Sequence, residues 1–335
     1  KIYLHSETCN TSKAVSEIDF FGNSYPHYAE IRRILFEGIG HEYEQLPLCI
    51  ADFNLFQTVH SKDYLGNLVT LSTGIHVENM RMGLECSGLE FCLPGYCAGL
   101  GGMLLAIDEM KAGKLDAAYV FSLGGHHSYA DWGHGYCLLN PQAAAVRYAQ
   151  HQGFKRVLII DWDIHHGDGT QAIFANDSTV HCLSIHSGLD LYMSTMRVIR
   201  DGSSKAGQAI GHTNIPLIHQ AYTDQDVEEL KYDGKVYRGD QSILAFESHL
   251  NNLDFEPDLI TIFAGFDGHI EDCGHEITNW DDSSFIRLTE IIKAIASKKG
   301  TPILSVQGGG YNLDSTIAGA EKHIAALSVY GRNQT

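Results

Sequence analysis

An apolar run that ends in a row of metal-binding side chains occupies residues 157–169. Asp161, Asp163 and His165 follow the apolar residues at alternate positions. Alternate side chains of an extended chain project to the same face, so these three groups are predicted to lie together. Ionisable groups packed this closely are costly to bury unless a positive charge lies among them, and a divalent cation commonly provides it. The pattern favours a metal site over a solvated loop around a core histidine.

The first ~115 residues are predicted to be mainly helical, and strand and helix patterns alternate over the rest of the chain. Buried strands are predicted at residues 117–123, 156–161, 179–185, 259–264 and 301–306. Helices are predicted at residues 28–37, 61–71, 100–113, 141–153, 169–175, 283–297 and 314–329, and a further helical region opens at Thr223. Residues 187–212 are expected to be irregular, like many segments that shape binding sites. The predicted fold class is α/β, with a mostly parallel central sheet and helices on both faces, in one domain over residues 1–335.

Reactive side chains follow four of the predicted strands directly. In parallel α/β sheets, ligands bind outside the carboxyl ends of the strands. The residues concerned are His126 and His127 after the first strand, Asp163 and His165 after the second, Asp267 after the fourth and Tyr311 after the fifth. Their common position predicts a single active site at this edge of the sheet.

The candidate metal ligands are Asp163, His165 and Asp267, which offer two carboxylates, one imidazole and no thiolate. A catalytic zinc keeps three protein ligands and an open position, whereas a structural zinc is closed by four ligands, usually with cysteine among them. The set therefore indicates catalysis. It also suits Fe(II), Mn(II) or Co(II), so the ligands alone leave the metal open.

Hydrolysis needs a base that accepts a proton from water and an acid that protonates the leaving group. His126 and His127, adjacent after a glycine turn, can supply both, although a surface histidine pair is the alternative. Asp161 and Asp168 are candidates to orient the two imidazoles. Tyr311, on a glycine-rich turn, can donate its hydroxyl to a developing oxyanion. Metal-assisted hydrolysis of an amide or ester is therefore the leading reaction class.

The composition limits the classes of binding partner and indicates a cell compartment. The 335 residues include 23 Lys+Arg against 41 Asp+Glu, and the net charge of −18 argues against nucleic acid and anionic membranes and mildly favours cationic substrates. No stretch approaches the roughly 20 apolar residues of a bilayer span, and the first residues do not form a signal-peptide pattern. Eight cysteines without a Cys-x-x-Cys pair are typical of reduced thiols, so a cytoplasmic location is expected.

Five ordered motifs resemble the signature of the histone deacetylase and acetylpolyamine amidohydrolase superfamily. They are Gly125-His126-His127, Gly135-Tyr136-Cys137-Leu138-Leu139-Asn140, Asp161-Trp162-Asp163-Ile164-His165-His166-Gly167-Asp168-Gly169-Thr170-Gln171, Ala264-Gly265-Phe266-Asp267 and Gly308-Gly309-Gly310-Tyr311-Asn312-Leu313. The resemblance covers most of the chain. It implies an arginase-like α/β fold with one Zn²⁺ bound by Asp163, His165 and Asp267. It further implies that His126 and His127 are the general-base and general-acid pair, that Asp161 and Asp168 support them, and that Tyr311 polarises the acyl carbonyl.

The resemblance implies further binding positions. A structural potassium ion would be held by Asp161, Asp163, His165, Ser184 and the backbone of Ile185. A second alkali site would use carbonyls around Phe174, Asp177, Val180 and Gly211. Gly135 and Tyr136 would lie at the acyl-lysine tunnel, with Tyr136 as one aromatic wall. The family's proline-and-aromatic motif is missing from residues 187–195, so Tyr192 or Leu191 is a candidate for the second wall.

The predicted function is removal of an acetyl or other short acyl group from an acylated amine. An acylated lysine of a peptide or protein is the leading substrate, and an acylated polyamine is the alternative. A catalytically silent relative that binds acyl-lysine is less favoured, as is an arginase-like guanidine hydrolase, which would need ligands for a second metal. After the metal-binding positions, Glu271, Asp272 and Glu276 are expected to form a solvated acidic loop, with contact to a cationic substrate chain as the alternative.

Overall fold

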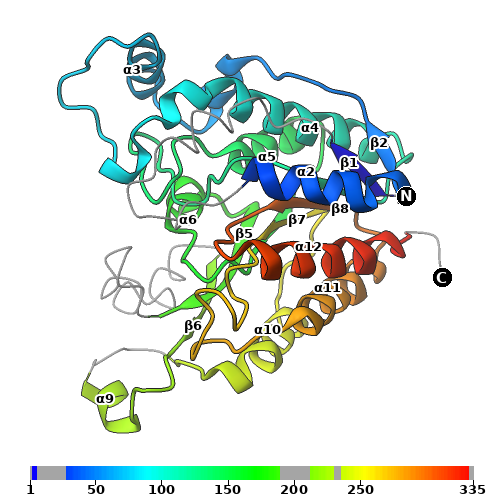
Figure 1. Ribbon diagram of the computed structural model, residues 1–335. Coiled ribbons are helices and arrows are strands. Elements are labelled where there is room, and N and C mark those ends of the chain that lie inside the picture. Colours follow the sequence, from blue (N-terminus) through cyan, green and yellow to red (C-terminus); the bar gives the residue numbers. More distant parts are fainter. Residues whose placement is uncertain (1, 6–27, 189–211, 230–234, 332–335) are drawn as a thin grey trace.

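The computed structural model describes residues 2–5, 28–188, 212–229 and 235–331 (Figure 1). Eight strands within these residues form one sheet with only parallel pairings, in the order β2-β1-β3-β8-β7-β4-β5-β6. The strands are β1 (Ile2–His5), β2 (Glu44–Leu46), β3 (Ala117–Val120), β4 (Val157–Asp161), β5 (Val180–Ser187), β6 (His212–Leu217), β7 (Leu259–Ala264) and β8 (Ile303–Gln307). The predicted α/β architecture with a parallel sheet is confirmed.

Helices cover both faces of this sheet, as Figure 1 shows. One face carries α3 (Lys62–Ser72), α4 (Leu93–Lys111), α5 (Pro141–His151) and α6 (Asp168–Phe174). The other face carries α2 (Tyr28–Ile39), α10 (Ser242–Asn251), α11 (Asp282–Ser297) and α12 (Leu313–Ser328), and the short α9 (Asp224–Glu229) has no buried residues. The start of α5 follows its sequence signal, because the Asn140 side chain accepts a hydrogen bond from the Ala143 N–H at 2.9 Å.

The apolar run of β4 is explained by burial on both sides of the sheet. Val157 and Ile159 pack with the helices of one face, and Leu158 and Ile160 pack with the helices of the other. A fully buried aliphatic side chain stabilises a fold by roughly 1.5–3 kcal/mol, so burial on both faces favours apolar residues at these positions. The run ends at Asp161, where the strand reaches the edge of the sheet.

Four adjacent strands in the middle of the sheet carry the predicted site residues. These strands are β3, β8, β7 and β4, in that spatial order, although they are far apart in the sequence. Their parallel direction puts all four carboxyl ends on the same edge. The loops that leave them hold His126 and His127, Tyr311, Asp267, and Asp163 with His165. Strand order therefore positions the site.

Three strands were not predicted, and one is shorter than expected. The first 115 residues were expected to be mainly helical, but they contain β1 and β2. β6 contains Pro216 and polar residues, and it forms one edge of the sheet, where proline is tolerated. The strand expected at residues 117–123 ends at Val120. Short or edge strands lack the continuous apolar run by which central strands are recognised.

One helical segment of the described chain has the length and apolarity that a membrane span requires. It is Leu89–Lys111, with a hydropathy of 1.4, and 78% of its most apolar window is buried inside the protein. Its apolar residues pack in the hydrophobic core between α3, α5 and the sheet. This burial is that of a core helix.

A buried histidine beneath the sheet makes folding sensitive to acid. His323 Nδ1 lies 2.7 Å from Thr289 Oγ1, and Nε2 lies 2.8 Å from Ser305 Oγ. Burial lowers the pKa of His323 to about 3, from an ordinary value of 6.5. Below pH 6.5 this histidine is therefore protonated in the unfolded chain, whereas in the folded chain it stays neutral until the pH falls to about 3.

We expect this histidine alone to lower the free energy of unfolding by about 3 kcal/mol between pH 6.5 and pH 4. Its destabilising effect is absent above pH 6.5 and grows as the pH falls. The variant His323→Gln, which keeps a polar side chain but does not titrate, should show a shallower decline. Urea denaturation at a series of pH values measures both slopes. Equal slopes for the two proteins would contradict the assignment.

Candidate active site

Three metal-binding groups meet at the carboxyl ends of β4 and β7. Asp163 and His165 lie in the loop after β4, and Asp267 follows β7. Their donor atoms all lie within 4.8 Å of one another. His165 Nδ1 is 2.9 Å from Asp267 Oδ2 and 3.1 Å from Asp163 Oδ1. The structure thus brings the three predicted ligands together.

Backbone N–H groups orient the two carboxylates. The Gly309 N–H donates to Asp163 Oδ2 at 2.8 Å, and the Ile164 N–H donates to Asp267 Oδ1 at 3.0 Å. Such outer contacts fix the direction of metal-binding oxygens and are part of a functional metal site. Glycine is needed at position 309, because this backbone passes directly beside the two carboxylates.

The electrostatics of this cluster favour the binding of a cation. Burial, together with the charge of Asp163, raises the pKa of Asp267 well above its usual range, and burial likewise raises the pKa of the neighbouring Asp161. A positive charge among such closely buried carboxyl groups would stabilise their ionised forms. A zinc ion fits the one nitrogen and two carboxylate donors and would retain an open coordination position. Other divalent metals share this donor preference.

We expect Gly309→Ala to weaken zinc binding by about 10- to 100-fold, the usual effect of disturbing the support of a metal ligand. A β-carbon at this position would lie 2.7 Å from Asp163 Oδ2 and 2.9 Å from Asp267 Oδ2, so the carboxylates must move apart. Competition with a chelating dye measures the affinity. The matched control is Gly66→Ala in α3, where an added β-carbon meets nothing within 4 Å. Equal zinc affinity in the two variants would refute the expectation.

Each predicted catalytic imidazole contacts its own carboxylate. His126 Nδ1 lies 2.9 Å from Asp161 Oδ2, and His127 Nδ1 lies 2.9 Å from Asp168 Oδ1. An Nδ1–H donated to a carboxylate leaves Nε2 as the nitrogen that can accept a proton. His126 Nε2 is 3.9 Å from Asp163 Oδ1, so this nitrogen lies beside the metal-binding groups. The two ring centroids are 4.0 Å apart, which places both imidazoles at one location.

Burial sets the protonation of this histidine pair. It lowers the pKa of His126, and it lowers that of His127 to about 3, with a further contribution from His126. Burial alone would raise the pKa of Asp168, but its contacts with His127 and His134 hold it well below its usual range. Both imidazoles are therefore neutral near pH 7 beside an ionised Asp168, and a neutral imidazole can accept a proton.

Tyr311 lies next to the metal-binding groups and is held by an acidic side chain. Its ring and that of His165 are edge to face, with centroids 5.9 Å apart. Asp272 Oδ2 accepts hydrogen bonds from the Tyr311 N–H at 2.7 Å and the Asn312 N–H at 2.8 Å, just before α12. Amide groups at a helix start favour such a carboxylate. The expectation of a solvated acidic loop is therefore wrong for Asp272, whereas Glu271 and Glu276 are exposed.

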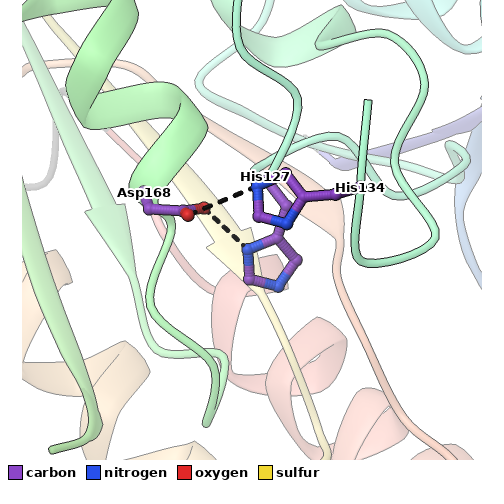
Figure 2. Close-up of side chains that lie close together, drawn as sticks. All are labelled: His127, His134 and Asp168. Atoms are coloured by element: carbon purple, nitrogen blue, oxygen red, sulfur yellow. Dashed lines mark hydrogen bonds and ion pairs between the residues drawn. The ribbon is translucent and has the colours of Figure 1, made fainter. Parts of the chain in front are cut away.

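The sequence reasoning missed His134. Figure 2 shows the Asp168 carboxylate facing both His127 and His134. His134 Nε2 lies 3.3 Å from Asp168 Oδ2, and the Tyr129 hydroxyl donates to the same oxygen at 3.1 Å. Both residues lie in the irregular segment between β3 and α5, where no periodicity marks a side chain as facing the site.

The remaining predicted residues are only partly described. Ser184 pairs in register with Asp161 across β4 and β5, and Ile185 follows it. Around the predicted second alkali site, the Asp177 N–H donates to the Phe174 carbonyl and the Val180 N–H to the Asp177 carbonyl, whereas Gly211 lies outside the described residues. Gly135 and Tyr136 both adopt positive φ, and the Tyr136 side chain is buried. Tyr192 and Leu191 also lie outside the described residues.

Comparisons with known proteins agree with this geometry. A family model described as "Histone deacetylase domain" matches residues 32–327. The chain is 34% identical over 223 residues to the acetoin utilization protein AcuC of Bacillus subtilis, which covers 64% of this chain and 51% of that protein. It is 32% identical over 225 residues to histone deacetylase 6 of Caenorhabditis elegans, and the match covers 64% of this chain and 22% of that protein. It is 28% identical over 278 residues to polyamine deacetylase HDAC10 of Mus musculus, and the match covers 81% of this chain and 39% of that protein.

The chain spans between 22% and 51% of the length of these relatives. Among solved structures, the HDA15 HD domain has a TM-score of 0.73 at 21% identity, covering 98% of this chain and 91% of that one. This likeness establishes the fold.

Proposed function

The chain belongs to the histone deacetylase family, and we propose that it is a zinc-dependent deacylase that hydrolyses the amide bond of an acylated amine. The observation that carries the proposal is one cluster of side chains. Three metal-binding donors lie within 4.8 Å of one another, and two His–Asp pairs, one buried and one partly buried, adjoin them. Amide hydrolysis needs a Lewis acid, a proton acceptor, a proton donor and an oxyanion partner, and the cluster offers a residue for each role.

The proposed roles follow from the geometry. Asp163, His165 and Asp267 would hold zinc, which supplies Lewis acidity toward the acyl carbonyl and acidifies water. His126, whose Nε2 lies beside the metal-binding groups, accepts a proton from the attacking water. His127 takes up a proton from solvent at Nε2 and passes it to the leaving amine.

The other polar residues position the two imidazoles or stabilise the charge that develops on the carbonyl oxygen. Asp161 and Asp168 hold the two imidazoles by their Nδ1 atoms. This leaves Nε2 of each ring for the reaction. Tyr311, beside His165, donates its hydroxyl to the carbonyl oxygen as negative charge develops there. The proposed potassium site at Asp161, Ser184 and Ile185 would support the same loop from beneath, because Asp161 and Ser184 are neighbours across two strands.

An acyl-lysine of a peptide or protein is our leading substrate, and an acylated polyamine is the alternative. Relatives of both kinds are similar to this chain: one is named a histone deacetylase and another a polyamine deacetylase. Acylation removes the charge of the modified nitrogen, but a polyamine and a lysine-rich peptide both keep other cationic groups, so the net charge of −18 does not distinguish the two substrates. We place the protein in the cytoplasm on its cysteine usage.

The test is hydrolysis by protein of known metal content. A matched panel contains an acetyl-lysine peptide, an acetylpolyamine and lysine peptides with longer acyl groups, each assayed before and after chelation and after zinc is restored. We expect turnover of one class that chelation abolishes and zinc restores. Binding of acyl-lysine by zinc-loaded protein without hydrolysis of any member would instead favour a silent acyl-lysine-binding relative.

A further inference from the structure

A second group of metal-binding side chains lies next to the proposed catalytic cluster. It consists of His127, His134 and Asp168, whose donor atoms also lie within 4.8 Å of one another. Asp168 Oδ1 is 2.9 Å from His127 Nδ1, and Asp168 Oδ2 is 3.3 Å from His134 Nε2. Figure 2 shows both imidazoles directed at this carboxylate. Two imidazoles and one carboxylate are a donor set that binds zinc and similar divalent metals.

The Nε2 atom of His134 lies beside Asp168 but has no hydrogen-bond partner among the described residues. His134 is 7% exposed. Its Nε2 faces Asp168 but is not aligned for a hydrogen bond, and no other described group bonds to it. A buried polar atom without a hydrogen bond destabilises the folded state. The ring is held in place by stacking on Trp132, with centroids 4.0 Å apart and planes 9° apart. A cation beside Asp168 would satisfy this nitrogen without moving the ring far.

The carboxylate of this group is already oriented. The Tyr129 hydroxyl donates to Asp168 Oδ2 at 3.1 Å, and the Gly169 N–H donates to Asp168 Oδ1 at 2.9 Å. Outer hydrogen bonds of this kind are the usual support of a metal-binding carboxylate. The N···O separations of 2.9 and 3.3 Å are close to those of neighbouring ligands on an ion with bonds of about 2.0–2.2 Å.

We propose that His127, His134 and Asp168 form a second, weaker zinc site whose occupation inhibits hydrolysis. The inhibitory part rests on the proposed function, because it needs His127 to move a proton. Zinc at Nδ1 of His127 leaves the ring proton on Nε2, and the ring then has no free nitrogen to accept another. It also takes Asp168 away from its hydrogen bond with His127. Loss of this bond makes the second site weaker than the first.

The experiment counts zinc and measures turnover separately. Equilibrium dialysis with elemental analysis should give two zinc equivalents per chain in the wild type, the second at higher free zinc. His134→Phe keeps an aromatic ring against Trp132 but removes the nitrogen, and it should bind one equivalent. Turnover of the wild type should fall about tenfold as the second equivalent binds. Protein molecules with zinc at this site would lose general acid–base catalysis, and the remaining turnover would come from the minority without it. His134→Phe should change less than twofold over the same zinc range, relative to its own starting rate.

His134→Gln is the second variant if the phenylalanine side chain destabilises the fold, which thermal melting will show. Wild-type protein that binds one equivalent, or a second equivalent that persists in both variants, overturns the site. Two equivalents in the wild type with turnover unchanged overturn the inhibitory role. If no acyl amide is hydrolysed at any zinc concentration, the proposed function fails, but the count of zinc equivalents still decides whether the second site exists.

Discussion

Asp267→Asn is expected to lose tight zinc binding and to reduce hydrolysis on the order of 1,000-fold or more, because the Lewis acid is lost. Asparagine keeps the shape of the side chain, and its oxygen can still accept the hydrogen bond that the Ile164 N–H gives to Asp267. What it removes is the charge of one of the two buried carboxylates of the cluster. Zinc content by elemental analysis and turnover of the preferred acyl amide measure the two effects.

The same variant should separate metal binding from folding. Without metal, the wild type buries carboxylates whose mutual repulsion is uncompensated, so the neutral asparagine should leave the melting temperature equal or higher. Added zinc should raise the melting temperature of the wild type but not of the variant. Asp314→Asn, which changes an exposed carboxylate at the start of α12, is the control and should retain zinc and turnover. Full zinc content in Asp267→Asn would refute this ligand set.

The central strands of the sheet could be predicted from the sequence, because burial on both faces requires mostly apolar residues along each strand. β4 is an uninterrupted apolar run up to Asp161, β7 is apolar except for Thr261, and the chemically reactive residues begin where each strand ends. The metal-binding role of Asp163, His165 and Asp267, and their position at the ends of the strands, could therefore be predicted. Parallel strands put these ends on one edge, so the convergence followed from the fold class alone.

The edges of the sheet and the surroundings of the site could not be predicted in the same way. β2 has two exposed residues among its three, and β6 includes a proline, so neither has a hydrophobic pattern strong enough to mark it. His134 reaches Asp168 only through the path of an irregular segment, which tertiary contacts determine. Asp272 looked like any exposed acid, because its two hydrogen bonds go to backbone N–H groups distant in sequence.

Tyr311→Phe is expected to lower kcat by about 100- to 1,000-fold, the usual cost of removing one donor to an oxyanion, with KM changed little. The hydroxyl would act on charge that appears only as the carbonyl is attacked, so its loss should leave substrate binding intact. Zinc content should also stay at the wild-type value, because the proposed ligands are Asp163, His165 and Asp267, which the variant keeps. Steady-state kinetics with zinc-analysed protein measure all three quantities.

Two further variants show whether this effect belongs to the position of the hydroxyl. Tyr148→Phe removes an exposed phenol that donates to Asp108 at 2.9 Å, and it should leave kcat unchanged. Asp272→Ala keeps the Tyr311 hydroxyl but removes the acceptor of two backbone N–H groups, so it should lower kcat by about tenfold through misplacement of the ring. If Tyr311→Phe retained kcat within a few fold while Asp272→Ala did not, the segment would matter for shape alone, and another donor would have to stabilise the oxyanion.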